Sequence, residues 1–331
     1  MVELPFVSII VVNYNLKKYL KECFDSLADI NYPKNKYEVI MVDNASNDDS
    51  VEYTTKKFPF VKVLKLDRNY GYPGGCNRGA LIANGEYIIF LNADVRVERN
   101  WLIEQIKVIH NDRTIAACGC NVKGFDDPQI IQSVGAVVLP TGDAIHLGAG
   151  EYDSKDLSKE PKEVAVVFGV SILVRKSIFE EVGKFDEEFF MYSDETDLLL
   201  RFWLYGYKVV VVPTSIVYHI KGGGIFSSNQ IYFTNKNRLL VILKNFELRN
   251  CIKGIIISLF YDIIRIIIFF KNMKFENITA LVKGDIDALK TIPSALRKRK
   301  IIQMERKIKD AYLLKMGFMV GLSFGIKSFL K

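Results

Sequence analysis

The segment FLNADVRV, residues 90–97, follows the apolar run 87–89 and changes from a hydrophobic strand to an acidic turn within two residues. A continuous apolar run bounded by turn residues is typical of a strand buried on both faces. Asn92 and Asp94 then have two interpretations. Such residues are common in turns because their side chains bond to nearby backbone, but their oxygens also suit hard divalent cations. The segment predicts either an ordinary loop or a metal site where a parallel strand ends.

The chain before this segment repeats one pattern. Strand-like apolar runs at 7–12, 37–42 and 61–66 alternate with helix-like segments at 17–28, 48–57 and 74–84. This alternation predicts an α/β fold with a Rossmann-like, mostly parallel sheet flanked by helices on both faces. Such sheets bind ligands in the crevice beyond the carboxyl ends of their strands.

Polar residues stand where each of the four runs ends. Because the carboxyl ends of parallel strands share one edge of a sheet, we expect their side chains to form one site. In chain order they are Asn13 and Asn15, Asp43, Asn69 and Gly71, and Asn92 and Asp94.

The middle of the chain is less regular. Residues 112–165 predict a loop-rich stretch facing the crevice, because Gly, Asp and Pro are scattered among short strand-like pieces. A second helix is expected from an N-cap at Ser193 to Gly206. Around it we expect a strand within 164–174, a short helix at 175–182 capped by Gly183, and strands at 209–212 and 215–219.

Composition narrows the class of protein. Half of the 331 residues are hydrophobic, which excludes wholesale disorder. The five cysteines are odd in number and lack a CxxC pair, so neither a zinc site nor a disulfide framework is expected and a reducing compartment is the default. Residues 1–5 carry no basic leader, so no signal peptide is expected.

Charge is unevenly distributed. Residues 251–331 carry 16 Lys and Arg against 6 Asp and Glu, a net +10, so the first 250 residues carry −3. A glycine-rich link at 221–224 precedes a change to Ile, Leu, Phe and Lys-rich helical sequence. We therefore expect two domains, 1–225 with the catalytic sheet and 226–331, helical and basic.

The stretch 254–270 is 17 residues long, at the lower limit for a membrane span. Ser258, Asp262 and Arg265 share one stripe, which favours a helix lying in the membrane interface; an oligomer or packing helix and a true span are the alternatives. The basic run 297–300 and the apolar C-terminal segment suit an anionic leaflet. Nucleic acid is not expected as a partner, since neither a groove-reading motif nor stacking aromatics accompany the charge.

Five sequence motifs occur in a fixed order along the chain. They are VSIIVVNYN, MVDNASNDDS, NYGYPGGCNRG, LNADV and FFMYSDETDLLLRFWLYGYKVVVVP followed by VYH. Over about residues 6–224 the chain resembles a family 2 glycosyltransferase with the GT-A fold, most of all the rhamnosyltransferase-like branch. The resemblance implies an inverting, metal-dependent enzyme that moves a sugar from a nucleotide-diphosphate sugar to a glycan or lipid-linked glycan acceptor, in cell-surface polysaccharide or glycoprotein glycan assembly. With the basic tail, it implies a peripheral enzyme at the cytoplasmic face of the cell membrane.

The resemblance also implies roles for the strand-end residues in donor binding. Asp43 would accept a hydrogen bond from a pyrimidine ring N–H. In the glycine-rich motif, close backbone approach and a helix N-terminus would serve the phosphates. The implied donor-binding residues are Asn13, Asn15, Asp43, Asn69, Gly71, Asn77 and Asn92.

Asp94 resembles the last acid of the family's DxD motif, which implies a bound Mg²⁺ or Mn²⁺ with the donor diphosphate as a further ligand. Asn92 stands where the first Asp often lies, so the site holds one less negative charge. His219 stands where similar enzymes place a His near the metal; a strand-end His satisfied by backbone is the alternative.

The acid pair Asp194 and Glu195 supplies the candidate catalytic base. An inverting transfer needs one carboxylate to take the proton from the attacking hydroxyl, and no covalent enzyme intermediate. By resemblance the base is Glu195, with Asp194 as the alternative, and a mere preference of acids for a helix N-terminus is the structural explanation.

Two other functions compete. A nucleotidyltransferase would call for a basic residue in the first turn to grip a triphosphate, and residues 13–15 offer none. A donor-binding scaffold without turnover is compatible with Asn92, whereas Asp94 and Glu195 argue against it.

Overall fold

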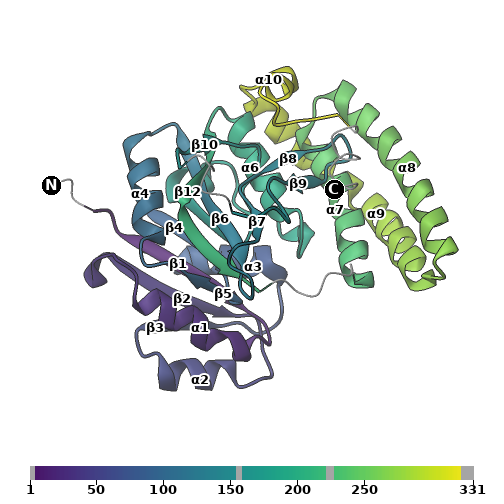
Figure 1. Ribbon diagram of the computed structural model, residues 1–331. Helices are drawn as coiled ribbons and strands as arrows, with labels where there is room; N and C mark the ends of the chain where they lie inside the picture. The colour runs from purple at the N-terminus through teal and green to yellow at the C-terminus, as the bar shows by residue number, and fades with distance from the viewer. Residues whose placement is uncertain (1–3, 154–158, 221–226, 322–331) are drawn as a thin grey trace.

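A ten-stranded mixed sheet forms the centre of the computed structural model, which describes residues 4–153, 159–220 and 227–321 (Figure 1). Its first half is parallel, in the order β4-β1-β2-β3, and the predicted alternation of strands and helices is confirmed there. The elements are β1 Val7–Asn13, α1 Lys17–Ala28, a 3-10 turn Lys34–Lys36, β2 Tyr37–Asp43, α2 Ser50–Lys57, β3 Val61–Lys65, α3 Gly71–Ile82 and β4 Tyr87–Asn92.

The second half of the sheet is mixed, which corrects the prediction of a mostly parallel sheet. β11 lies antiparallel between β4 and β6, and β12 runs parallel to β6. The strands expected at 209–212 and 215–219 are one strand, β12, with a register shift between them. The elements are β5 Val95–Val97, α4 Trp101–Asn111, β6 Ile115–Gly124, β7 Ile131–Ser133, β8 Ala136–Val138, β9 Ala144–His146, β10 Lys162–Glu163, β11 Ser171–Arg175, α5 Lys176–Glu181, a 3-10 turn Glu187–Phe189, α6 Asp194–Leu204 and β12 Lys208–His219.

The long strand β6 lies within the stretch predicted to be loop-rich, so that prediction is wrong for residues 115–124. β6 is buried, but besides Ile115 and Val122 it contains mainly small residues, Ala, Gly and Cys. Gly119 explains part of this composition, because a Cβ there would lie only 2.3 Å from the Cβ of Val167. The strand has small side chains at such positions because another segment packs closely on it.

Two hydrophobic cores cover the two faces of the sheet. In β1, Ile9 and Val11 point to the core formed with α1, α2 and α4, whereas Ile10 and Val12 point to the core formed with α3, α5 and α6. This alternation follows from the period of two in a strand. Both faces are therefore buried, and ligand access is left to the strand ends.

The C-terminal part is helical, as predicted, with α7 Ser228–Asn245, α8 Leu248–Lys271, α9 Phe275–Glu305 and α10 Asp310–Lys315. Figure 1 shows α8 and α9 at one end of the molecule, with α7 between them and the sheet. Leu240 of α7 and Ala295 of α9 belong to the same hydrophobic core as sheet residues. The link 221–224 and the boundary expected near residue 226 lie outside the described residues, and the division into two domains stays a prediction.

Helix α8 presents its polar stripe to the protein, not to solvent as a surface helix would. Asp262 pairs with Arg238 of α7, and Arg265 donates to Asn235 Oδ1 at 2.8 Å. Ser258 is buried on the same stripe. The apolar residues of α8 are consequently on its outer face. No helix among the described residues has both the length and the apolar character needed to cross a membrane.

The basic run 297–300 is also divided between the interior and the surface. Lys298 Nζ contacts Asp186 and Glu188 at 2.7 Å, and Arg299 donates to two carbonyl oxygens of α7 and its C-terminal end. Arg297 and Lys300 are exposed. Only part of this run is therefore available to an anionic surface.

A buried ion cluster joins α7 to α6 and to the segment before it. The fully enclosed Lys244 Nζ lies 2.6 Å from Asp186 Oδ2 and 2.8 Å from Asp197 Oδ1, and Arg201 pairs with Asp197 at 2.9 Å. Burial raises the pKa of both carboxyls, but the adjacent cations outweigh it and hold each pKa below its ordinary value of 3.8. The cluster is thus charged at neutral pH.

Replacing Lys244 with Met is expected to lower the free energy of unfolding by about 3 kcal/mol, because removing one partner leaves two buried carboxylates less well compensated. The wild-type carboxyls bind protons more weakly folded than unfolded, so their contribution is present above pH 3.8 and is lost as the pH falls below it. Urea unfolding of both proteins, from neutral pH to below pH 3.8, measures the difference and its loss in acid. Equal stability throughout would contradict the role given to Lys244.

Candidate functional site

The ends of β1 and β2 are joined by a polar cluster. Asn13 and Asp43 are register partners, and Asn13 Nδ2 donates to Asp43 Oδ1 and to Ser46 Oγ, both at 3.0 Å. Both residues are buried, and Asn13 Oδ1 has no hydrogen-bond partner among the described residues. Asn15 is exposed beside them, with φ +56° and its Oδ1 accepting from Asn47 N at 2.8 Å. The ends of β1 and β2 therefore form one polar cluster at the carboxyl edge of the sheet.

The glycine-rich motif, residues 69–79, forms the start of helix α3 beside this polar cluster. Asn69 Oδ1 accepts from Gly71 N at 2.8 Å, and Asn44 Nδ2 donates to Gly71 O at 3.0 Å. Gly71 has φ +74°, and a Cβ there would lie 2.2 Å from the carbonyl oxygen of Phe190. The need for glycine is thus explained by the close approach of the chain that precedes α6, and a donor role for Gly71 stays a prediction.

Asn77 lies further along α3. Its Nδ2 donates to Phe185 O at 2.9 Å, and its Oδ1 accepts from Phe185 N at 3.2 Å. In this conformation the Asn77 amide ties α3 to the segment before α6. Donor binding by Asn77 is a prediction that its present partners do not support.

Asp94 and His219 meet at the end of β4. Asp94 follows Asn92, and β5 then pairs with β12 so that Val95 is the register partner of His219. His219 Nε2 lies 3.6 Å from Asp94 Oδ2. The sheet therefore brings these two predicted metal ligands together although they are far apart in sequence.

Gln132, which sequence reasoning missed, fixes the His219 ring. Its Nε2 donates to His219 O at 2.8 Å, so its Oε1 is the atom 2.7 Å from His219 Nδ1. Nδ1 must then carry a proton, which leaves Nε2 as the ring nitrogen that faces Asp94. Metal-binding histidines commonly have this arrangement, with the second ring nitrogen donating to an oxygen.

The residues present fit a divalent cation that is also held by its substrate. One carboxylate oxygen and one imidazole nitrogen are suitable ligands, and Mn²⁺ accepts both kinds. Within residues 4–153, 159–220 and 227–321, no group of three or more His, Cys, Asp and Glu side chains could hold a metal ion. Asp94 and His219 would therefore need further oxygen ligands, which a diphosphate can supply.

The turn before α6, residues 190–193, is strained and leads directly into Asp194 and Glu195 at the start of the helix. Phe190, Tyr192 and Ser193 have φ values of +62°, +64° and +59°. Ser193 occupies the predicted N-cap position, but its side chain makes no capping hydrogen bond. Left-handed non-glycine residues cost about 1 to 3 kcal/mol each and are concentrated at functional sites.

The two acids have different environments. Asp194 is buried, and its Oδ2 has no hydrogen-bond partner among the described residues. Burial, and secondarily the charge of Glu195, raises the pKa of Asp194 well above its ordinary value. Burial also raises the pKa of Glu195, which retains partial solvent exposure. Glu195 is the acid that a substrate can reach.

The segment 168–170 lies between the acid pair and the metal pair. A Cβ on Gly169 would lie 3.4 Å from the Glu195 carboxyl carbon, and the Phe168 ring meets the His219 ring edge-on at 5.7 Å. Val170 O accepts from Asn92 N at 3.0 Å. The base candidate and the metal ligands thus border one short segment.

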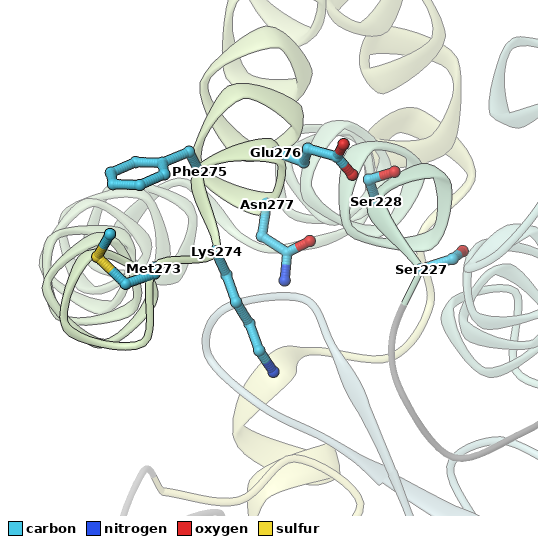
Figure 2. A pocket seen from close by; sticks show the side chains of 7 residues that line it. All are labelled: Ser227, Ser228, Met273, Lys274, Phe275, Glu276 and Asn277. Carbon is cyan, nitrogen blue, oxygen red and sulfur yellow. The ribbon is translucent and has the colours of Figure 1, made fainter.

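Two surface clefts lie elsewhere, between the start of α7 and the start of α9. One of about 480 Å³ is lined by Ser227, Ser228 and residues 273–277 (Figure 2). The other, of about 700 Å³, shares Ser228 and is lined also by Phe233. Neither cleft contains a predicted site residue, so the strand ends remain the candidate site.

Sequence similarity to known proteins extends over more than half of this chain. Residues 8–183, just over half of the chain, match the family model described as Glycosyl transferase family 2. Glycosyltransferase AglE of Haloferax volcanii is 26% identical over 185 residues, which are 55% of this chain and 56% of that protein. The O-antigen biosynthesis protein RfbC of Myxococcus xanthus is 30% identical over 225 residues, 65% of this chain and 17% of that protein. The chain spans about half or less of the length of these relatives.

Solved structures share the fold. A crystal structure of GalNAc-T7 with UDP, GalNAc and Mn²⁺ superposes with a TM-score of 0.62 at 20% identity, covering 74% of this chain and 48% of that one. S. aureus TarS 1–349 in complex with UDP-GlcNAc gives 0.60 at 19% identity, covering 91% and 87%. These likenesses confirm the predicted GT-A fold.

Proposed function

Because the chain belongs to glycosyl transferase family 2, we propose that it transfers a sugar from a nucleotide-diphosphate sugar to a glycan or lipid-linked glycan acceptor, with inversion at the anomeric carbon. One observation carries the proposal. A partly exposed carboxylate with a raised pKa, Glu195, borders the same segment as the Asp94–His219 pair at the carboxyl edge of the sheet.

Glu195 acts as the general base in this proposal. It takes the proton of the acceptor hydroxyl, whose oxygen bonds to the anomeric carbon while the bond from that carbon to the diphosphate oxygen breaks on the opposite face. The buried Asp194 supports Glu195 at the start of α6 and is the alternative base. A raised pKa suits this role, because a base is most effective when its pKa is near the working pH.

Asp94 and His219 would hold Mg²⁺ or Mn²⁺, which supplies positive charge for the leaving diphosphate. In this proposal the remaining strand-end residues form the donor pocket. The Asn13–Asp43 cluster lies beneath the nucleotide base of the donor, and Asn15 and Asn92 lie at the rim of the pocket. The GalNAc-T7 structure with UDP and Mn²⁺ supports a donor of this class.

We also propose that the helical part of the chain, 226–331, rests on the cytoplasmic face of the cell membrane. The outer face of α8 is apolar, and isolated apolar residues are normal on surfaces whereas continuous patches indicate interaction. Exposed cations, Arg249 and Lys253 near its start and Lys271 and Lys274 at its end, suit anionic lipid headgroups. The exposed apolar residues are Leu248, Ile252, Ile256, Leu259, Phe260, Ile263, Ile264, Ile267, Ile268 and Phe270.

Charging this apolar face is expected to weaken membrane binding. Ile263 and Ile267 are 55% and 50% exposed, so the double change Ile263→Glu and Ile267→Glu should leave the fold intact and lower partitioning onto anionic phosphatidylglycerol vesicles by about tenfold or more. Sedimentation with vesicles measures the bound fraction. Leu81→Glu, on the 69% exposed Leu81 of α3, is the matched control and should bind like wild type. Wild-type protein that stays in solution, or that forms a dimer through this face, would contradict the proposal.

Turnover of a panel of nucleotide-diphosphate sugars with Mn²⁺ tests the reaction itself. We expect one donor to raise the melting temperature and to lose its sugar to a glycan acceptor or, slowly, to water. Stabilisation without any turnover would favour the scaffold. Release of pyrophosphate from a nucleoside triphosphate and a sugar phosphate would favour the nucleotidyltransferase.

A further inference from the structure

Helix α7 contacts the strained turn, residues 190–193, that leads into the two acids at the start of α6. The side chain of Asn237 is fully buried, and its Nδ2 lies 2.9 Å from Phe189 O, 2.7 Å from Met191 O and 2.8 Å from Tyr192 O. One amide group thus faces three carbonyl oxygens within four residues of backbone. Asn237 lies beyond residues 8–183, which match the family model.

The turn is held from its other side by the glycine-rich motif. Tyr72 N donates to Phe190 O at 2.7 Å, and Gly71 allows this carbonyl its close approach. The carbonyl oxygens of residues 189 to 192 therefore all have partners: Phe190 O accepts from α3, and the two N–H groups of Asn237 Nδ2 are shared among the other three. A conformation with three left-handed residues persists only where its surroundings determine it in this way.

Further contacts of α7 follow the same segment. Lys236 Nζ donates to Glu188 O at 2.7 Å, and the Phe233 ring stacks on Phe190 with centroids 5.4 Å apart and planes 15° apart. Phe190 itself has φ +62°. These neighbours keep the segment against α7, but only Asn237 bonds to the backbone between Phe189 and Tyr192 from this side among the described residues.

We propose that Asn237 is a positioning residue, which holds the turn so that Glu195 meets the acceptor hydroxyl in a reactive orientation. This inference rests on the proposed function. Without the amide, the left-handed residues can relax toward ordinary backbone conformations and rotate the first turn of α6. A displacement of about 1 Å at a reacting group can cost about a hundredfold in rate.

Asn237→Ala is expected to lower kcat about a hundredfold while the donor KM changes less than about threefold, because the amide donates to the turn and to none of the predicted donor-binding residues. Asn235→Ala is the matched control. Asn235 is equally buried on α7 but bonds to Leu281 O and to Asp285, away from the turn. The control should lose stability similarly and retain its kcat.

Amide hydrogen exchange gives a second measurement that does not depend on activity. We expect Asn237→Ala to increase exchange in residues 188–196 and Asn235→Ala to leave this segment unchanged. Equal losses of kcat in both variants, a loss confined to KM, or unchanged exchange in 188–196 would overturn the inference. Wild-type protein without transfer would overturn the proposed function, whereas the exchange comparison would still decide whether Asn237 holds the turn.

Discussion

Glu195→Gln is expected to lower kcat by about a thousandfold, with a donor KM close to that of wild type. Gln has nearly the shape of Glu but cannot accept the proton of the acceptor hydroxyl, and general-base catalysis contributes about 10² to 10⁴ in rate. The measurement is sugar transfer at saturating donor. Asp194→Asn, made in parallel, distinguishes the two acids: we expect the smaller loss there, because Asp194 is buried and Glu195 is partly exposed.

The pH dependence gives this prediction a second test. Burial raises the pKa of Glu195 above its ordinary value of 4.5. The base must be unprotonated to act, so wild-type kcat should fall as the pH is lowered, and should begin to fall above the usual carboxylate range. The residual activity of Glu195→Gln should lack this decline. Glu180→Gln, on the exposed Glu180 of α5, makes the same chemical change away from the site and should behave like wild type. A larger loss in Asp194→Asn would assign the base to Asp194.

Local patterns were enough to predict the first half of the fold. Apolar runs such as 7–12 and 87–89 show their strands directly, and the polar residues that follow mark the edge of the sheet. The register of β1 and β2 in the structure places Asn13 beside Asp43, as expected when neighbouring parallel strands end together. Short-range sequence signals suffice wherever consecutive strands are neighbours.

Residues whose partners are distant in sequence could not be predicted. Gln132 bonds to His219 across 87 positions, and Asn237 bonds to Tyr192 across 45. β6 was missed for a related reason, because Gly119 reflects the packing of Val167 and not a turn. A single sequence states what each residue can do but not which distant residue it meets.

Helix α8 shows the same limit for amphipathic patterns. Its period correctly indicates that Asp262 and Arg265 share a face, but period alone does not say whether that face is inside or outside. Arg238 and Asn235 of α7 decide the question, because they satisfy both charged groups in the interior. The polar stripe therefore packs, and the apolar face is left exposed.

Asp94→Asn is expected to abolish the Mn²⁺-dependent part of donor binding and to lower kcat/KM by about a hundredfold or more. Among the described residues the predicted site has one carboxylate and one histidine, so the change removes the negative charge that Asp94 supplies. Metal affinity depends strongly on the charge of the ligands. The melting temperature of the protein with a nucleoside diphosphate, with and without Mn²⁺, measures binding independently of turnover.

The opposite change at the same strand end makes the prediction sharper. Asn92→Asp restores the charge that the DxD pattern would carry. This variant should therefore need a lower Mn²⁺ concentration for half-maximal stabilisation by the nucleotide. Asp94→Asn should show no Mn²⁺-dependent stabilisation at any concentration used. Asp126→Asn, on an exposed loop residue, controls for the loss of one negative charge and should match wild type. If all three variants respond to Mn²⁺ as wild type does, the Asp94–His219 pair is not a metal site. FLNADVRV then ends its strand in an ordinary turn, and transfer without the metal would have to rely on cationic side chains to neutralise the leaving diphosphate.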